Sequence, residues 1–506
     1  MKKIVLYIWI VLMAWLVPGA CIDDKTSGFK TDGSPIVISV QDTVVYQDFG
    51  FPLVIEPEIT QLLPDLPLKY EWRWMAMDGG EGSDSLRFIS GEKVFEHEFS
   101  RAGVFKIRLR VENQYGSSFK YFTANIRAPF ERGLLILSND EEDNGRLSFV
   151  RLKEENELLD KENTDFNSNA FGQANPEIIL WGARDVIFVR TGKDYPYSYV
   201  LAISSEPEQK IYFLNGRYFL MENIVDVKKF YPEAYPTVLC GNGDNAARKM
   251  MFGTNDRMGH PGDCGFVHME SFLAYPGETS GTYDKIIVGE YKDEDWGLTT
   301  YLGWFIDNIH SNVWGIEYGN STFTSGERFT GKQVINGAYI DKSGKIVLVA
   351  VEKDDPRKVS IHKSDFYSWD WDTREIVFES DPYIYTVDGD LNLTADSRMV
   401  SNGKYQYIYY YQGNKIYRWV YMAQEPELPT KPELILDDPD DEITCMEMSP
   451  NREHMWVCVY NKNADTELKG KLLIVNPATM TVEKTIKGIS DRAIKVMWKP
   501  VEFNEK

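Results

Sequence analysis

The chain has 506 residues and carries 55 Lys and Arg against 77 Asp and Glu, for a formal net charge of −22. This length predicts two or three domains with substantial cores, and a hydrophobic fraction of 43% excludes a mostly disordered chain. The acidic balance disfavours nucleic acid as a partner, and the presence of only five cysteines excludes a disulfide-dense scaffold.

The first twenty residues have the organisation of a secretory signal peptide. Lys2 and Lys3 precede an apolar run over 4–17, which is shorter than the roughly 20 residues that a membrane-spanning helix needs. Small residues then precede Cys21, as at the sites where a lipoprotein signal peptidase cleaves and a diacylglycerol is added to the thiol. We therefore expect Cys21 to be the lipidated first residue of the mature chain. The alternative is a plain secretory peptide with an incidental cysteine.

Residues 21–34 have the composition of a flexible tether, because they are polar and contain two glycines. Asp23 and Asp24 follow the expected lipidated cysteine and resemble the acidic export tag of lipoproteins on the outer face of the outer membrane. We therefore expect an outer-membrane protein that is lipid-anchored and faces the cell exterior.

Residues 35–129 show the two-residue alternation of half-buried strands between turn-forming segments. Over 104–111 every second residue is apolar and most of the others are basic, and aromatic residues alternate over 70–74. Short strands over about 90 residues are typical of an immunoglobulin-like β-sandwich. The residues predicted to alternate in this way are Tyr70, Trp72, Trp74, Phe105, Ile107, Leu109 and Val111.

Two segments of this unit resemble the polycystic-kidney-disease (PKD) repeat. Tyr70-Glu71-Trp72 is similar to its aromatic–x–Trp strand, and 101–113 is similar to its Gly-containing turn and long alternating strand, with an Asn near the end. The repeat's usual Gly-Asp-Gly turn is missing, so the domain is PKD-like. Together with the lipoprotein N-terminus and the segment 133–138, the chain resembles the PKD-like family lipoproteins. This resemblance implies an accessory surface lipoprotein that is found with a starch-utilisation-type outer-membrane importer.

Residues 130–506 contain many strand-like runs and little helical periodicity, which predicts an all-β unit, a β-propeller. Four strands are predicted over 442–448, 455–460, 472–475 and 481–486, which is the content of one blade. About 370 residues at the usual 40–50 residues per blade predict seven or eight blades. A second, larger sandwich or two stacked all-β domains are the alternatives.

Aromatic residues make up 13% of the chain and are concentrated in two segments of this unit. Exposed rings can stack on sugars or hold peptide side chains. We therefore predict ligand binding for Trp369 and Trp371 in one segment and for Tyr407 and Tyr409 in the other. The alternative is that these rings fill the packed interfaces between blades.

One acidic segment suits a calcium ion, which prefers several oxygen ligands. Asp388, Asp390 and Asn392 alternate, and Asp396 follows. Because the sixth and twelfth positions are not Gly and Glu, the segment is not an EF-hand, and the prediction is a looser surface calcium site, with an acidic turn as the alternative. The acidic runs 437–442 and 140–143 are predicted to be solvated loops.

Cys445 and Cys458 lie symmetrically about a turn between Asn451 and Arg452, which predicts that they face each other on paired strands. An exported location permits a disulfide there, whereas strain in such cross-strand pairs argues against one. The thiol and disulfide states therefore both stay open.

The densest group of metal-ligand residue types is His260, Cys264 and His268. Their spacing matches no closed structural zinc site, so we predict an ordinary turn. Cys264 is also the candidate partner of Cys240 in a second disulfide.

The sequence contains no nucleophile elbow, phosphate-binding loop, dinucleotide fingerprint or HExxH motif. We therefore expect no catalytic residues and no cofactor other than the candidate calcium ion. The predicted function is a non-enzymatic capture or accessory module for import of an oligosaccharide or a peptide, beside an outer-membrane importer. The alternatives are a propeller-type lyase or hydrolase that acts on an extracellular polymer, and a scaffold for an importer or a surface protease.

Overall fold

The computed structural model describes residues 34–77, 85–160, 166–191, 198–229, 235–241, 249–253, 264–268, 271–274, 285–293, 298–317, 321–340, 343–403 and 406–500. The predicted signal peptide, Cys21, most of the predicted tether and His260 lie outside these residues. The chain divides into two compact units, Met1–Pro129 and Phe130–Lys506.

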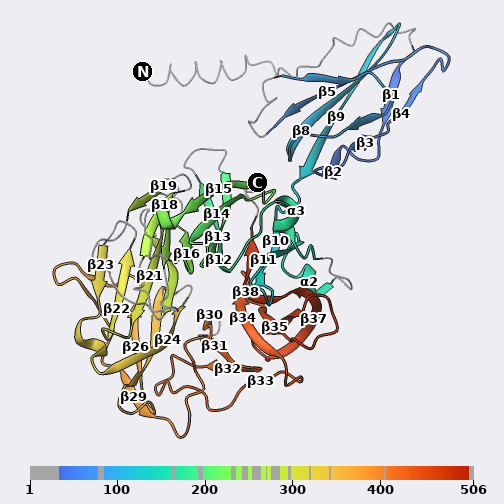
Figure 1. The fold of residues 1–506 in the computed structure, drawn as a ribbon. Helices are drawn as coiled ribbons and strands as arrows, with labels where there is room; N and C mark the ends of the chain where they lie inside the picture. Colours follow the sequence, from blue (N-terminus) through green and yellow to red (C-terminus); the bar gives the residue numbers. More distant parts are fainter. Residues whose placement is uncertain are drawn as a thin grey trace, which may run out of the picture. The chain divides into compact units, whose positions relative to one another are not determined.

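The first unit is built from three sheets that surround one hydrophobic core (Figure 1). In the largest sheet, β2 pairs in parallel with β9, and the other neighbours are antiparallel. Two two-stranded antiparallel sheets, β1 with β4 and β3 with β7, complete the unit. The strands of the large sheet are, in spatial order, β2 (Val44–Asp48), β9 (Gly116–Arg127), β8 (Gly103–Asn113), β5 (Lys69–Ala76) and β6 (Arg87–Ser90); the small pairs are β1 (Ile36–Ser39) with β4 (Glu58–Gln61) and β3 (Leu53–Ile55) with β7 (Phe95–His97).

The alternation in the sequence places one face of the large sheet in this core. Trp72 is fully buried, and its indole Nε1 donates to the carbonyl oxygen of Glu92 at 3.0 Å. The predicted inward set on β8 is buried throughout. Buried Asn113 ends β8: its amide oxygen accepts from the backbone N–H groups of Tyr115 and Gly116, and its nitrogen donates to Ser34. These bonds fix the hairpin between β8 and β9.

The described residues of the second unit form seven sheets, and its few helices are each at most five residues long. The helices are α2 (Glu157–Asp160), α3 (Ala170–Ala174), η1 (Val227–Lys229) and η2 (Gly326–Phe329). The first three sheets are β38 (Arg492–Lys499), β10 (Gly133–Asn139) and β11 (Gly145–Arg151); β12 (Ala183–Thr191), β13 (Ser198–Ser205), β14 (Lys210–Asn215) and β15 (Met221–Asp226); and β16 (Val238–Gly241), β17 (Lys249–Gly253), β18 (Cys264–His268) and β19 (Ser271–Ala274).

The remaining four sheets follow in chain order, and short β27 and β28 extend the first of them. They are β20 (Lys285–Asp293), β21 (Leu298–Asp307), β22 (Asn312–Glu317) and β23 (Ser321–Thr324) with β28 (Glu375–Ile376) and β27 (Trp369–Asp370); β24 (Lys332–Ile340), β25 (Lys345–Glu352), β26 (Lys358–Asp365) and β29 (Tyr383–Thr386); β30 (Val400–Asn402), β31 (Tyr407–Gln412), β32 (Lys415–Trp419) and β33 (Leu434–Ile435); and β34 (Glu442–Met448), β35 (Met455–Tyr460), β36 (Gly470–Asn476) and β37 (Thr481–Ser490).

One edge strand of each sheet contacts the corresponding strand of the next sheet, and these contacts form a closed ring. The order is β38, β12, β16, β20, β24, β30 and β34, which in turn contacts β38. Within the described residues this is a propeller-like arrangement of seven sheets around an axis. The alternatives of a second sandwich or two stacked all-β domains do not have this ring.

The middle strands of these sheets are apolar along their whole length because both of their faces are covered. In β25, Val347 and Val349 pack into one core cluster, whereas Ile346 and Leu348 pack into the cluster on the other side. A strand that is buried on both sides loses the alternation seen in the first unit.

Strand β38 closes the ring. It pairs antiparallel with β10, so the beginning and the end of the second unit meet in one sheet (Figure 1). The buried Lys499 amine donates to the carbonyl oxygen of Glu131 at 2.6 Å, at the same junction. The sequence did not indicate this strand, although it placed the four strands of the preceding sheet correctly, with β34 and β35 predicted at their observed bounds.

No helix in the described part of the chain has the length and apolar character needed to span a membrane.

Candidate functional site

A cavity of about 1150 Å³ lies where the seven ring strands meet. Every one of these strands contributes to its wall, so the cavity is a product of the whole ring and of no single sheet. Representative wall residues are Asp185 of β12, Val238 of β16, Ile287 of β20, Ala338 of β24, Val400 of β30, Thr444 of β34 and Lys495 of β38.

The cavity wall is rich in charge of both signs. Six acidic and six basic side chains line it, so their formal charges cancel although the whole chain carries −22. The acidic residues are Asp140, Asp143, Asp185, Asp396, Glu442 and Glu447; the basic residues are Arg184, Lys285, Arg398, Arg452, Arg492 and Lys495.

Asp185 connects three neighbouring sheets at the cavity wall. One carboxylate oxygen accepts from the Lys495 amine at 2.6 Å, and the other accepts from the backbone N–H of Leu239 at 2.8 Å. Asp185 is buried, so its charge depends on these partners. The contacts join β12 to β38 on one side and to β16 on the other.

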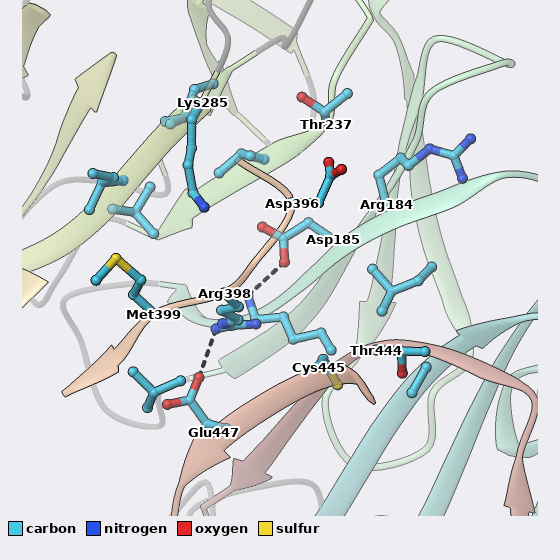
Figure 2. Close-up of a pocket in the computed structure, with 18 of the residues that line it drawn as sticks. Arg184, Asp185, Thr237, Lys285, Asp396, Arg398, Met399, Thr444, Cys445 and Glu447 are labelled. Carbon is cyan, nitrogen blue, oxygen red and sulfur yellow. Dashed lines mark hydrogen bonds and ion pairs between the residues drawn. The ribbon is translucent and has the colours of Figure 1, made fainter. Parts of the chain in front are cut away.

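A second ion pair spans two more sheets. Arg398 precedes β30, and its guanidinium lies 2.7 Å from a carboxylate oxygen of Glu447 on β34 (Figure 2). Arg492 of β38 makes a two-pronged contact with Glu442 of β34. The charged residues of the wall therefore join adjacent blades while presenting polar atoms to the cavity.

Two donors fix the loop that carries Asp396 and Arg398 into the cavity. The Lys285 amine donates to the carbonyl oxygens of Ala395 and Ser397 at 3.0 and 2.9 Å. The buried Asn336 amide donates to the carbonyl oxygens of Thr394 and Ser397 at 2.7 Å. A loop held at these carbonyls keeps its side chains in a defined place.

Two residues of the acidic run 140–143, Asp140 and Asp143, line the cavity, whereas Glu141 and Glu142 are exposed as predicted. Asp143 accepts from the Arg184 guanidinium and from the Asn139 amide, and Arg184 also contacts Glu206 at 2.5 Å. Burial opposes ionisation of Asp140, but hydrogen bonds led by those from Asn144 outweigh it and lower its pKa. The prediction of a solvated loop was therefore wrong for Asp140 and Asp143 only.

In the second acidic run, 437–442, Asp437, Asp438 and Asp440 are exposed as predicted, but Asp441 is buried. Buried Asp441 accepts from the Lys471 amine at 2.6 Å and from the Asn461 amide at 2.9 Å. Because the loop returns against β36, it brings a carboxylate next to a lysine that lies thirty residues later.

None of the four predicted aromatic ligand-binding residues lines the cavity. Tyr409 is fully buried, and its hydroxyl donates to the carbonyl oxygen of Pro477 at 2.8 Å, so its prediction as an exposed ring was wrong. Trp369 stacks on Phe323 with ring centroids 4.7 Å apart. Tyr407 is half-buried beside Arg418, and Trp371 is 50% exposed.

The predicted calcium ligands are not grouped around a common point. No cluster of three or more His, Cys, Asp or Glu side chains in the described ranges could hold a metal ion. Asp388 and Asp390 are exposed, whereas the Asn392 amide oxygen accepts from the Tyr410 hydroxyl at 2.8 Å. Asp396 instead lines the cavity.

The predicted register of Cys445 and Cys458 is confirmed, because they are direct partners on β34 and β35. Both are buried free thiols, and Cys445 lines the cavity. Cys240 and Cys264 lie on β16 and β18, with β17 between them. The side chains of Cys240, Cys264 and His268 are outside the described set, so the second bridge stays a prediction.

No protein-family model matches this chain. No curated protein matches it. Among solved structures, it is similar to a quinonprotein alcohol dehydrogenase-like protein from Bacteroides thetaiotaomicron, with 13% identity, a TM-score of 0.42, and coverage of 91% of this chain and 97% of that chain.

Two further solved structures are similar at comparable distance. Apo AztD from Citrobacter koseri has 9% identity and a TM-score of 0.37, with coverage of 86% of this chain and 98% of that one. An auxiliary nutrient binding protein from Bacteroides thetaiotaomicron has 12% identity and a TM-score of 0.33, with coverage of 85% and 96%. These similarities are too distant to assign a function.

Proposed function

We propose that this protein is a lipid-anchored surface protein that captures an oligosaccharide or a peptide for nutrient import, without catalysing a reaction. The observation that carries the proposal is the cavity of about 1150 Å³ on the ring axis, with wall residues from all seven ring strands. A largely pre-formed cavity of this size with convergent polar groups is the usual form of a ligand site.

The wall chemistry favours a polar ligand. A ligand that displaces water from twelve charged side chains must replace the hydrogen bonds that they lose. Sugar hydroxyls and peptide groups both donate and accept hydrogen bonds. They therefore suit a wall that offers donors, such as Arg398 and Lys495, beside acceptors, such as Glu447 and Asp185. An apolar ligand would leave these groups without partners.

The pairing of the carboxylates favours capture over cleavage. Glycoside hydrolysis needs one carboxyl group that stays protonated and one that is ionised. Asp143, Asp185, Glu442 and Glu447 each form an ion pair with a basic side chain of the wall, so these four carboxylates are already engaged within the fold.

In this proposal the first unit is a PKD-like domain that separates the cavity from the membrane, and Cys21 carries the lipid. The chain would be a PKD-like family lipoprotein on the outer face of the outer membrane, beside an importer that takes over the captured nutrient. The alternating strand β8 and the terminal Asn113 support the PKD-like assignment.

The test uses the chain from Ile22 onward, which lacks the predicted lipidation site. It is incubated with defined oligosaccharides and with peptide digests, and mass spectrometry scores both retained ligands and new products. We expect retention of one ligand class without new products. New products would overturn the non-enzymatic proposal, and no retention of either class would overturn the capture proposal.

A double variant connects the retained ligand to the cavity. R398Q/E447Q removes one wall ion pair without changing the net charge, and we expect it to weaken retention at least about tenfold. The matched control is R357Q/D355N, which removes an exposed pair with 65% and 44% side-chain exposure. Equal retention by both variants would place the ligand elsewhere.

A further inference from the structure

The outward face of the five-stranded sheet in the first unit carries an ordered row of aromatic and basic side chains. Phe88 of β6 is the partner of Arg73 on β5, Arg73 is the partner of Arg108 on β8, and Arg108 is the partner of Tyr121 on β9. Neighbouring residues on these strands, such as Trp72, point into the core. The row therefore crosses four strands on the side away from the core, with an aromatic ring at each end and two arginines between.

The rings of this face are well exposed. Phe88 is 63% exposed, Tyr121 is 48% exposed, and Phe119 in the adjacent row is 44% exposed. Three large aromatic side chains that remain exposed on one sheet face form an unusual apolar surface for a soluble domain. Exposed rings of this kind can pack against the apolar face of a sugar ring.

The charges of the face are opposite in sign to the charge of the chain. On β5 and β8, Lys69, Arg73, Lys106, Arg108 and Arg110 provide five positive charges against Glu71 and Glu112, a balance of 5 − 2 = +3, whereas the chain carries −22. The Lys106 amine lies 4.8 Å from the Tyr121 ring centroid, and the Arg108 guanidinium lies 5.5 Å from that of Phe119. The cations are thus held beside the rings.

Glu71 orients the two central arginines without using all of their donors. One of its oxygens lies 2.8 Å from Arg108 and 3.0 Å from Arg73. Each guanidinium has five N–H donors in a fixed plane, and the two oxygens of one carboxylate can accept only some of the ten. The arrangement therefore pre-orients two guanidinium groups and leaves them able to bind a further anion in a two-pronged manner.

We propose that this face binds an anionic polysaccharide, such as a chain of uronic acid units, laid across the strands. The row from Phe88 to Tyr121 covers three strand spacings, or about 14 Å, which is the scale of a few linked sugar rings. The sugar faces would lie on Phe88 and Tyr121, and carboxylates between them would meet Arg73 and Arg108.

The order of residues in the row distinguishes this ligand from a membrane surface. A membrane-binding surface gathers its apolar side chains at the deepest point and places its cations around them. Here the two arginines lie between the rings. A polymer that alternates apolar ring faces with anionic groups matches this order, whereas a flat layer of headgroups does not.

The experiment uses the chain from Ile22 onward and measures its retention on immobilised polygalacturonate, with neutral dextran as the reference polymer. We expect retention on polygalacturonate alone, and we expect high salt to weaken it because exposed charges are screened. Equal retention on dextran, or binding to phosphatidylglycerol vesicles without retention on polygalacturonate, would overturn the proposal.

Three variants locate the binding. We expect R73Q/R108Q to weaken retention on polygalacturonate at least about tenfold and F88A/Y121A to weaken it about fivefold. The matched control R357Q/I179A removes one exposed cation and one exposed apolar side chain from the second unit and should retain native binding. Thermal unfolding verifies that each variant is folded.

Native retention by folded R73Q/R108Q would overturn the proposal, as would an equal loss in the control. These outcomes do not depend on the ligand of the cavity. Each one compares the retention of a face variant with that of the control variant, and polygalacturonate is the only ligand used. A cavity that captures nothing would therefore leave this test intact.

Discussion

The two units use charge in opposite ways. In the second unit, Asp185 and Lys495 form a pair at the cavity wall in which each side chain is at most 16% exposed. In the first unit, Arg110 and Glu112 form a pair on the outward sheet face with 38% and 43% side-chain exposure. The distances are nearly equal, 2.6 and 2.7 Å, so solvent access and not geometry separates the two pairs.

This difference teaches where a charge stabilises a fold and where it remains available for a partner. A buried charge that loses its counter-charge has no water to replace it, so its loss is strongly destabilising. An exposed pair is screened by water and contributes little. The wall charges thus hold the ring together, whereas the cations of the sheet face can change partners at small energetic cost.

The largest expected effect is that of D185N. The variant leaves Lys495 at the wall without its counter-charge and should lower the free energy of unfolding of the second unit by about 3 kcal/mol. Chemical denaturation measures the change. The control D355N, which removes an exposed carboxylate beside Arg357, should change it by less than about 0.5 kcal/mol. Equal effects of both variants would contradict the comparison.

In contrast to the buried charged pair of Asp185 and Lys495, His362 is a buried base that stays neutral. Its Nδ1 accepts from the Arg328 Nε–H at 3.0 Å, so its Nε2 carries the proton and faces the Ser360 hydroxyl at 3.0 Å. Burial, reinforced by Arg328 and Lys332, lowers the pKa of His362 to about 3.

Acid should therefore destabilise the second unit through this residue. Below its ordinary pKa of 6.5 the histidine of the unfolded chain takes up a proton, and that of the folded chain does not until about pH 3. Between pH 7 and pH 4.5 this difference should remove about 2 to 3 kcal/mol of stability. In H362Q, which does not titrate, that loss should disappear; an equal pH dependence in both proteins would refute the assignment.

Glu71 tests the charges of the exposed face. Hydrogen bonding from Arg73, together with Arg108, lowers the pKa of Glu71. Its stabilisation is therefore present above the ordinary carboxyl pKa and is lost as the pH falls through the lowered one. Because solvent screens this group, the loss should be below about 1 kcal/mol. Denaturation of E71Q between pH 7 and pH 3 should show a correspondingly weaker pH dependence in the first unit.

The smallest expected effect is that of R110Q. Its pair with Glu112 is exposed on both sides, so stability should change by less than about 0.5 kcal/mol. Thermal unfolding gives the value. A loss as large as that in D185N would show that the face is a structural element of the first unit and would remove the contrast between the units.

Local patterns predicted most of the strand structure. The alternation over β8 predicted which of its side chains are buried, and the symmetry of Cys445 and Cys458 about their turn predicted their pairing. Both patterns involve residues within one strand or one hairpin. In β25 both faces are buried, so its sequence predicts a strand but does not show which residues pack against which neighbouring sheet.

The cavity could not be predicted in the same way. Asp185 and Lys495 are 310 residues apart, and Arg398 and Glu447 are 49 residues apart. Nothing in either local sequence indicates the partner, because the packing of one sheet against the next brings each pair together. Exposed rings were predicted where strands are rich in tyrosine, yet the middle strand β31 buries Tyr409 between two packed sheets.

The pairing of β38 with β10 has a consequence for the order in which the protein is made. Strand β10 is synthesised near the start of the second unit, and β38 is synthesised after the unit's other described strands. Six sheets can form during synthesis, but the ring stays open until residues 492–499 are available. A chain that terminates earlier keeps the free edge of β10, where another chain can pair. Closure of the ring thus waits for β38, and the cavity forms when that strand is in place.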